Sequence, residues 1–221
     1  MKLPASGVQH EPRWPVALAT LAVVILLAVL PGRIRILPGW IVCVVGAATV
    51  LPMAAVTWSS EKARWLRVES TVTLLTVALM AVTTLAGLVQ LIVAMIDRST
   101  GMGGLELLTS SVAVWVANVL MFSLLYWQVD RGGPAGAAGT TGRRPDLYFA
   151  QEGAPAKVRP ADWRPTFPDY LFLAYSTATA FSATDVVPLT HRAKLMMMLE
   201  SAVSLVTIVV VAARAINVLG S

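Results

Sequence analysis

Long apolar segments constrain the fold of this chain more than any other feature. No charged residue occurs between Thr71 and Ile96, and about 18 apolar residues in a row are enough for a helix to cross a bilayer. Of all residues 57% are hydrophobic and 13% are charged, whereas soluble domains are about 25% charged. The apolar runs are continuous rather than alternating, which predicts helices and not a barrel. We therefore expect an all-α transmembrane protein.

Breaks between the apolar runs predict five membrane-spanning helices. The first run follows a basic residue, as in a signal peptide, but no cleavage site leads into a soluble domain, so it is interpreted as a retained span. The third span is about 31 residues or roughly 46 Å long, which exceeds a bilayer core and predicts tilt or projection. The predicted spans are residues 16–30, 40–58, 66–96, 105–129 and 189–219.

Polar segments divide the chain into four parts. Residues 1–15 form a polar N-terminal tail punctuated by proline, and residues 16–129 hold four of the predicted spans. Residues 130–164 contain a Gly/Ala-rich stretch without a helix or strand pattern, which predicts a flexible loop. Residues 165–221 hold a short apolar helix, a polar break and the last span.

Composition and spacing argue against several classes of function. The net charge is +5, but no Lys/Arg block is interleaved with aromatic residues, so no nucleic acid is expected. A single cysteine, Cys43, excludes an intrachain disulfide and a cysteine-cluster metal site. The consecutive residues Met196 to Met198 cannot share one helix face, so packing or lipid contact is expected there. Neither His10 nor His191 belongs to a nucleophile–base pair or a metal-ligand spacing. We therefore predict no enzyme, cofactor site or metal site.

The segment from Phe167 to Arg214 is the most informative part of the chain. Thr166 can cap a helix, and Asp169 suits its positively polarised first turn. The predicted helix over residues 168–180 is about 13 residues or roughly 20 Å long, too short to cross a bilayer. The following residues, Phe181 to Val187, must return to the surface as irregular backbone, which is tolerated at membrane depth only inside protein or beside water. The sequence therefore predicts a re-entrant helix and loop beside a pore or cavity.

A carboxyl group lies within the last predicted span. Glu200 is some 11 residues into that span, roughly 16 Å, where an ionised and unpaired carboxylate costs several kcal/mol. It should be protonated or hydrogen-bonded, with Tyr175 and Ser176 of the short helix as candidate partners. The sequence leaves two roles open for Glu200: it either holds neighbouring helices together through a hydrogen bond or lines a path for ions.

One face of the fourth predicted span carries large side chains at helical spacing. A packing face against neighbouring helices is the favoured interpretation, with the asparagine as an interhelical hydrogen-bonding group. The residues are Trp115, Asn118, Phe122 and Tyr126.

The C-terminal segment resembles the pore module of the potassium-channel superfamily, in which a pore helix, a selectivity filter and an inner helix follow one another. The match needs no gap and covers less than a quarter of the chain. The resemblance implies a homo-oligomer, specifically a tetramer, around a central path for ions. The residues at matching places are Thr177, Thr179, Asp185, Pro188, Arg192, Glu200 and Arg214.

The filter positions depart from the family pattern. Ala180 stands where the filter threonine belongs, Phe181-Ser182-Ala183-Thr184 replaces Val-Gly-Tyr-Gly, and Ser204 occupies the hinge-glycine position. A ladder of filter carbonyls needs glycine at backbone angles that other residues avoid, so potassium selectivity is not expected. If monovalent cations pass, hydroxyl groups would line the path and a carboxylate would attract cations at its mouth. The filter-like residues are Thr177, Thr179, Phe181, Ser182, Thr184 and Asp185.

The whole chain also resembles an uncharacterised family of bacterial multi-span integral membrane proteins, whose pore-like ending is here Phe181-Ser182-Ala183-Thr184-Asp185. This resemblance implies a multi-pass protein of the bacterial inner membrane, with the lipid bilayer as its surroundings. A transporter or small-molecule binder is less well supported, because no inverted repeat is visible in the sequence. Two functions are favoured. One is a channel-like protein with a cation path that is not potassium-selective. The other is a non-conducting scaffold or partner-binding protein that retains a channel-derived fold.

The orientation in the membrane is also open. The potassium-channel resemblance places the mouth of the filter outside the cell. The basic residues of the short loops weakly favour the mouth in the cytoplasm, because cytoplasmic loops are enriched in lysine and arginine.

Overall fold

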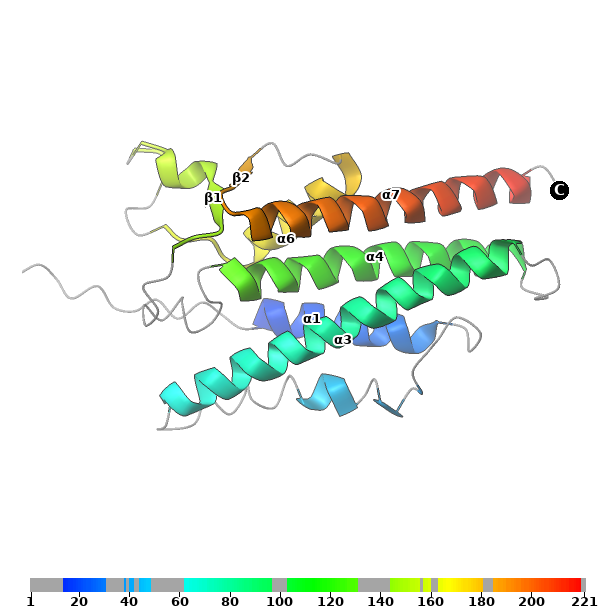
Figure 1. Cartoon of the computed structure of the whole chain (residues 1–221), viewed down its shortest axis with the longest axis horizontal. Helices are drawn as coiled ribbons and strands as arrows, with labels where there is room; N and C mark the ends of the chain where they lie inside the picture. Colours follow the sequence, from blue (N-terminus) through cyan, green and yellow to red (C-terminus); the bar gives the residue numbers. More distant parts are fainter. Residues whose placement is uncertain are drawn as a thin grey trace, which may run out of the picture.

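The structure is a computed structural model and is mostly helical. Its elements in chain order are α1 (Trp14–Val29), α3 (Lys62–Ile96), α4 (Gly104–Val129), β1 (Leu147–Phe149), the 3-10 helix η3 (Ala150–Gly153), α6 (Phe167–Ala180), β2 (Val186–Pro188) and α7 (His191–Leu219) (Figure 1). The residues that the structure describes are 14–30, 38, 40–41, 44–48, 62–96, 103–130, 144–155, 157–159, 163–180 and 185–219.

Helix α4 lies at the centre of the bundle. Helices α1, α3, α6 and α7 all contact it, and Figure 1 shows α4 between α7 and α1. Its buried residues extend around much of its circumference and include Ser111, Asn118, Phe122 and Tyr126. A helix that is apolar on most sides is stable when other helices enclose it. This explains why α4 is the most enclosed of the long apolar helices.

Helices α3 and α4 form an antiparallel pair that crosses at an angle (Figure 1). Near one end, the Gln128 side chain donates hydrogen bonds to the Ser70 hydroxyl at 2.6 Å and to the Ser70 carbonyl at 3.1 Å. Further along the pair, Gly87 faces Val114 at van der Waals distance. The long α3 therefore runs obliquely along α4.

Helix α1 buries one face. Its buried residues recur at spacings of one, three and four, which is the pattern of a helix packed on one side. They are Val16, Ala19, Thr20, Val23, Val24 and Leu27. Gly46 lies against this helix: a Cβ at Gly46 would be 3.3 Å from both methyl carbons of Val24. The helical residues 44–48 therefore pack closely on α1.

Among the residues that the structure describes, three helical segments are long and apolar enough to cross a membrane, namely Ser70–Ala94, Gly104–Val129 and His191–Ala213. The prediction of apolar spanning helices is confirmed for these three, and α4 begins one residue earlier than expected. Helix α1 has 16 residues and falls short of spanning length. It begins at Trp14, so the last two residues of the predicted tail are already helical. Of the predicted second span, residues 40–41 and 44–48 are helical and the others lie outside the described residues.

Residues 130–164, which were predicted to be a flexible loop, include β1 and η3 over Leu147–Gly153. β1 pairs antiparallel with β2, with Tyr148 opposite Val187. The side chains of Leu147 and Phe149 are buried. The strand has three residues and its partner is distant in the chain, so no local pattern could reveal it. The Gly/Ala-rich residues 131–143 lie outside the described residues.

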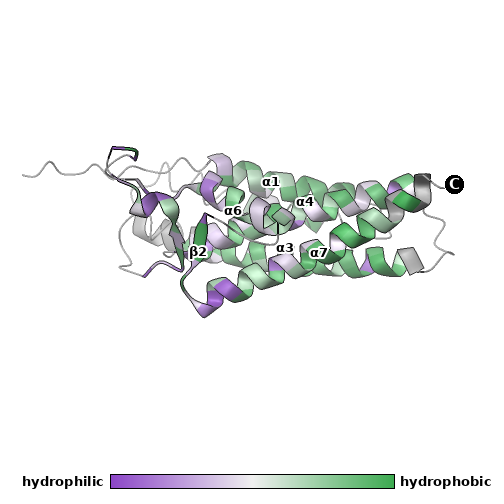
Figure 2. Ribbon diagram, turned by 90° about the horizontal axis from the view of Figure 1, so that it is seen from above, coloured by the Kyte–Doolittle hydropathy of each residue, from purple (hydrophilic) through white to green (hydrophobic). Residues whose placement is uncertain are grey.

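Hydropathy differs along the length of the bundle. Figure 2 shows apolar helices through the body of the molecule, and hydrophilic residues gather at the end that carries β1 and β2. The C-terminus of α4, the N-terminus of α7 and the two-stranded sheet meet at this end (Figure 1). It is the part of the molecule that positions α6.

Candidate functional site

The start of α6 is fixed by a side-chain cap. The Thr166 backbone N–H and hydroxyl donate hydrogen bonds to the Asp169 carboxylate, at 2.7 and 2.8 Å. The Asp169 N–H in turn donates to the Thr166 carbonyl at 2.9 Å. This reciprocal arrangement satisfies donors that a helix N-terminus leaves without partners. The expected helix start at these two residues is confirmed.

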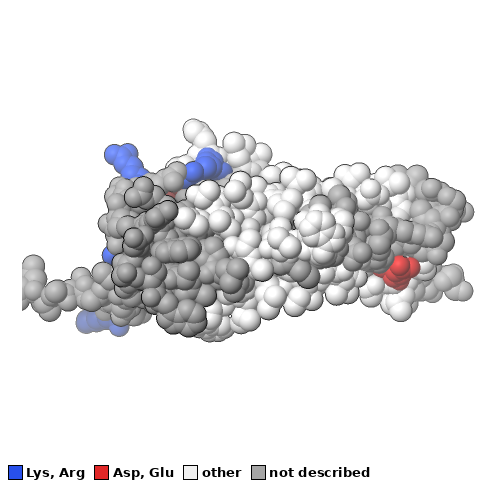
Figure 3. Space-filling model, turned by 90° about the horizontal axis from the view of Figure 1, so that it is seen from below, with Lys and Arg blue, Asp and Glu red and all other residues white. Residues whose placement is uncertain are grey.

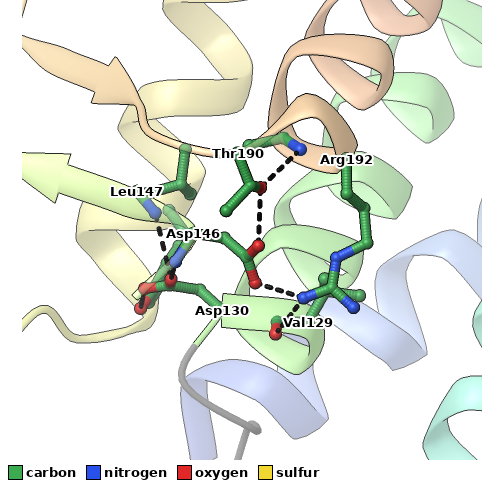
Figure 4. A network of polar contacts seen from close by, with 8 residues as sticks. Val129, Asp130, Asp146, Leu147, Thr190 and Arg192 are labelled. Carbon is green, nitrogen blue, oxygen red and sulfur yellow. Dashed lines mark hydrogen bonds and ion pairs between the residues drawn. The ribbon is translucent and has the colours of Figure 1, made fainter. Parts of the chain in front are cut away.

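Asp130 connects the end of α4 to β1 and α6. Its carboxylate is buried and accepts hydrogen bonds from the backbone N–H groups of Asp146 and Leu147, at 2.7 and 3.2 Å (Figure 4). Its other oxygen accepts the Tyr170 hydroxyl at 2.8 Å. A buried carboxylate is costly unless donors surround it, so these contacts hold three segments together.

Asp146 makes a second set of contacts, to the start of α7 (Figure 4). One carboxylate oxygen accepts the Thr190 hydroxyl at 2.6 Å, and the other forms an ion pair with the Arg192 guanidinium. The Thr190 hydroxyl oxygen accepts the N–H of Ala193 at 3.2 Å, as an N-cap residue does. We call the set Asp130, Asp146, Tyr170, Thr190 and Arg192 the polar clamp.

The polar clamp brings both ends of the segment from α6 to β2 to one end of the bundle. Tyr170, in the first part of α6, bonds to Asp130, and β2 pairs with β1 directly after Asp146. The Asp185 carbonyl accepts the N–H of Ala150 at 3.1 Å, which attaches the residue before β2 to the same region. The chain therefore runs along α6 into the bundle and comes back to the end from which it started.

Helix α6 packs with one face against α4 and α7, and its other face is exposed. Its buried residues include Leu173, Ala174 and Ala178. The ring of Tyr175 meets the ring of Trp115 on α4 edge to face, with centroids 6.2 Å apart. This geometry is a favourable one for aromatic pairs, and it places α6 along the central helix.

The filter-like residues predicted from the sequence lie in different surroundings. Thr177 is buried, and its hydroxyl has no hydrogen-bond partner among the described residues. Thr179 is exposed, and its hydroxyl donates to the Tyr175 carbonyl at 2.8 Å. Asp185 is exposed. The two threonines therefore lie on opposite sides of α6, as residues two positions apart on a helix must. Phe181, Ser182 and Thr184 lie outside the described residues.

Glu200 lies in the interface between α4 and α7 and is fully buried. The Tyr126 hydroxyl donates a hydrogen bond to Glu200 Oε2 at 2.5 Å. Neither expected partner on α6, Tyr175 or Ser176, is the donor. The prediction of a partner on α6 was wrong, because the face of α7 that carries Glu200 packs against α4.

A second hydrogen bond joins the same two helices. The Asn118 side-chain amide donates to the Ser204 hydroxyl at 3.0 Å, which confirms the asparagine as an interhelical hydrogen-bonding group. Phe122 and Tyr126 of the predicted packing face are buried as well. Oxygen atoms of Asn118 and Glu200 remain without a hydrogen-bond partner among the described residues. The α4–α7 interface is thus partly polar.

Sequence reasoning missed most of the polar clamp. Arg192 was noted for its place in the resemblance, but its partner Asp146 lies 46 residues away. Asp130 and Tyr170 are 40 residues apart. An acidic residue directly after an apolar span, as at Asp130, is the one local signal for such a contact. The pairing itself depends on how the helices are placed.

The part of the chain that the structure describes contains no group of three or more His, Cys, Asp and Glu residues arranged to hold a metal ion. Comparison of the chain with models of protein families, with curated proteins and with solved structures gave no match.

Proposed function

We propose that the chain is a channel-like integral membrane protein that assembles as a homotetramer and passes monovalent cations without potassium selectivity. The pore-like unit consists of α6, the residues that follow it, β2 and α7. The lengths and apolar composition of three helices support membrane insertion. The order of a short helix, a polar connection and a long apolar helix supports the pore-like unit.

One observation carries this proposal: the polar clamp holds the beginning of α6 and the strand that follows it at the same end of the bundle. A chain that enters a membrane and returns to its starting end has to turn within the membrane, where its backbone leaves the helix. Such backbone is stable only where protein or water meets its hydrogen-bonding groups. A water-lined path beside the residues after α6 satisfies this requirement.

The two-faced character of α7 supports assembly around this unit. One face of α7 is buried in the protomer and carries Ala193, Glu200, Val203, Ser204 and Thr207. The other face exposes large apolar side chains, among them Leu195, Met198, Leu205 and Val209. In a tetramer this exposed face meets a neighbouring copy or faces the central path, as the resemblance to potassium channels implies.

One exposed carboxylate of the unit supports a path for cations. Asp185 presents a carboxylate at the surface of the protomer directly before β2. Rings of acidic side chains select cations in other channels, and fourfold assembly would form such a ring. Hydroxyl groups would replace the carbonyl ladder of a potassium filter, with Thr179 as the exposed threonine of α6.

Planar-bilayer recording of the purified protein tests the proposal. We expect currents carried by both sodium and potassium, and Asp185→Asn should lower the permeability of cations relative to chloride. Glu106→Gln is the matched control, because Glu106 is also exposed but lies at the opposite end of α4. Silence in all ions and at all voltages, or identical selectivity of the two variants, would contradict a cation path.

A non-conducting scaffold is the second candidate, and the burial of Thr177 and Glu200 inside the protomer favours it. Thr177 was expected beside an ion path, and Glu200, for which an ion path and a structural role were both open, connects α4 and α7 through Tyr126. A structure of the assembled protein in lipid distinguishes the two functions. An axis filled by side chains supports the scaffold, whereas a continuous hydrated path rules it out.

A further inference from the structure

The two ends of the bundle differ strongly in positive charge. On the face that Figure 3 draws, the lysine and arginine side chains in blue lie toward one end of the bundle, which also carries the acidic residues Asp146, Glu152 and Asp185. Among the side chains that the structure describes, none at the opposite end belongs to a lysine or arginine, and the exposed Glu106 lies there. The described lysine and arginine side chains at the clamp end are Arg144, Lys157, Arg159, Arg164, Arg192 and Lys194.

The polar clamp determines where several of these cations lie. Arg144 lies shortly before Asp146 and β1, and Lys157 follows η3. Both residues belong to the connection between α4 and α6, which without contacts would extend away from the bundle. The pairing of β1 with β2 and the ion pair of Asp146 with Arg192 hold this connection against the start of α7. Lys194 lies in the first turn of α7. Three exposed cations from distant parts of the chain thus share one end of the molecule.

An aromatic side chain accompanies this charge. Trp163 is half-buried and packs against Phe149 of β1, with ring centroids 6.1 Å apart. Tryptophan is enriched where a membrane protein passes from the hydrocarbon core to the headgroups. Its position, together with the start of the apolar helices, places the clamp end at the level of the lipid headgroups.

We propose that the clamp end of the bundle lies on the cytoplasmic side of the membrane and that its exposed cations, Arg144, Lys157 and Lys194, bind headgroups of anionic phospholipids. Lysine and arginine close to the ends of spans face the cytoplasm. The cytoplasmic leaflet carries anionic lipid, which attracts each nearby cation by about 1 kcal/mol. This inference is independent of conduction. In this orientation α6 enters the membrane from the cytoplasmic side, whereas the potassium-channel resemblance implies that it enters from outside the cell.

Cysteine labelling tests the orientation in full-length protein. Lys157→Cys and Glu106→Cys are made separately in a Cys43→Ser background and expressed in a bacterial host. A membrane-impermeant maleimide is then added to right-side-out and inside-out vesicles, with labelling in detergent as the reference. We expect Lys157→Cys to react in inside-out vesicles and Glu106→Cys in right-side-out vesicles. Reaction of Lys157→Cys in right-side-out vesicles overturns the proposal.

Native mass spectrometry tests the lipid contact. Purified protein is given an equimolar mixture of phosphatidylglycerol and phosphatidylcholine, and the retained lipids are counted. We expect phosphatidylglycerol to be enriched, and the combined variant Arg144→Gln, Lys157→Gln and Lys194→Gln to lower that enrichment at least about fivefold. Arg214→Gln, at the opposite end, is the matched control and should leave it unchanged. Equal retention of both lipids, or no loss in the triple variant, overturns the lipid contact.

Discussion

At the scale of single residues, the structure contains two aspartates that are almost fully buried at the clamp end. Asp130 accepts three hydrogen bonds, from two backbone N–H groups and a tyrosine hydroxyl. Asp146 accepts one from Thr190 and pairs with Arg192. Because both carboxylates are surrounded by donors from other segments, their removal affects parts of the chain that are distant in sequence.

The ion pair of Asp146 and Arg192 is unequal in burial, and the two partners should therefore differ in importance. The Asp146 side chain is 6% exposed and that of Arg192 is 42% exposed. We expect Asp146→Asn to lower stability by about 2 kcal/mol, because hydrogen bonds to a buried charge are lost. Arg192→Gln should cost less than about 1 kcal/mol, because water screens the exposed partner. Thermal unfolding in detergent measures both, and an equal or larger loss for Arg192→Gln would contradict this account.

The hydrogen bond between Tyr126 and Glu200 leads to a prediction about compensation. Tyr126→Phe leaves a buried carboxyl group without its donor and should cost about 1–3 kcal/mol. Adding Glu200→Met should recover most of that loss, because an apolar side chain of similar size needs no partner. Tyr175→Phe is the control, since Tyr175 is exposed. Thermal stability of the four proteins provides the measurement, and a double variant less stable than Tyr126→Phe would refute the argument.

At the scale of elements, close contacts between helices determine which residues can be enlarged. The contact between Gly46 and Val24 brings the helical residues 44–48 against α1. α1 has 16 residues and buries one face, so its position depends on its neighbours. A side chain inserted at this contact has to move one of the two helices, because packed interiors leave little free volume.

Glycine substitutions test this contact. We expect Gly46→Leu to destabilise the protein by about 1–3 kcal/mol through overpacking. Gly103→Leu should have little effect, because no atom lies within 4 Å of a Cβ built at Gly103. Partial recovery of Gly46→Leu by Val24→Ala would identify the clash as the cause. Thermal unfolding of the variants decides the matter, and equal losses for Gly46→Leu and Gly103→Leu would exclude a specific clash.

At the scale of the whole molecule, α4 organises the bundle, and the remaining helices pack around it. The outer faces of α3 and α7 both expose large apolar side chains. In a membrane protein such faces contact lipid or another subunit, and composition alone does not distinguish these two surroundings. The proposed tetramer assigns the face of α7 to the assembly and that of α3 to lipid.

Subunit counting checks this assignment. Native mass spectrometry in a mild detergent should show four chains of 23.5 kDa each. Leu205→Trp combined with Val209→Trp on the exposed face of α7 should dissociate the assembly. The same enlargement at Leu75 and Val82, which are similarly exposed on α3, should leave it intact. A monomeric protein, or dissociation by the α3 variant, would contradict the assignment.

The sequence by itself determined the helices. Long apolar runs with few charged residues predicted α3, α4 and α7, and the residues Thr166 and Asp169 predicted the start of α6. These features are local, because whether a segment forms an apolar helix depends on the residues within that segment and on their caps. The hydrogen-bonding role of Asn118 was predictable for the same reason: a buried amide within an apolar helix requires a partner.

Only the tertiary structure decided which residues meet. Glu200 bonds to Tyr126, 74 residues earlier in the chain, although partners on the nearer helix α6 were expected. Asp146 pairs with Arg192, and β1 pairs with β2, across the whole of α6. These contacts depend on the order and rotation of helices around α4, and a local pattern of residues does not encode that arrangement. The physical need for a partner can be inferred from one segment, whereas the identity of the partner depends on how all of them pack.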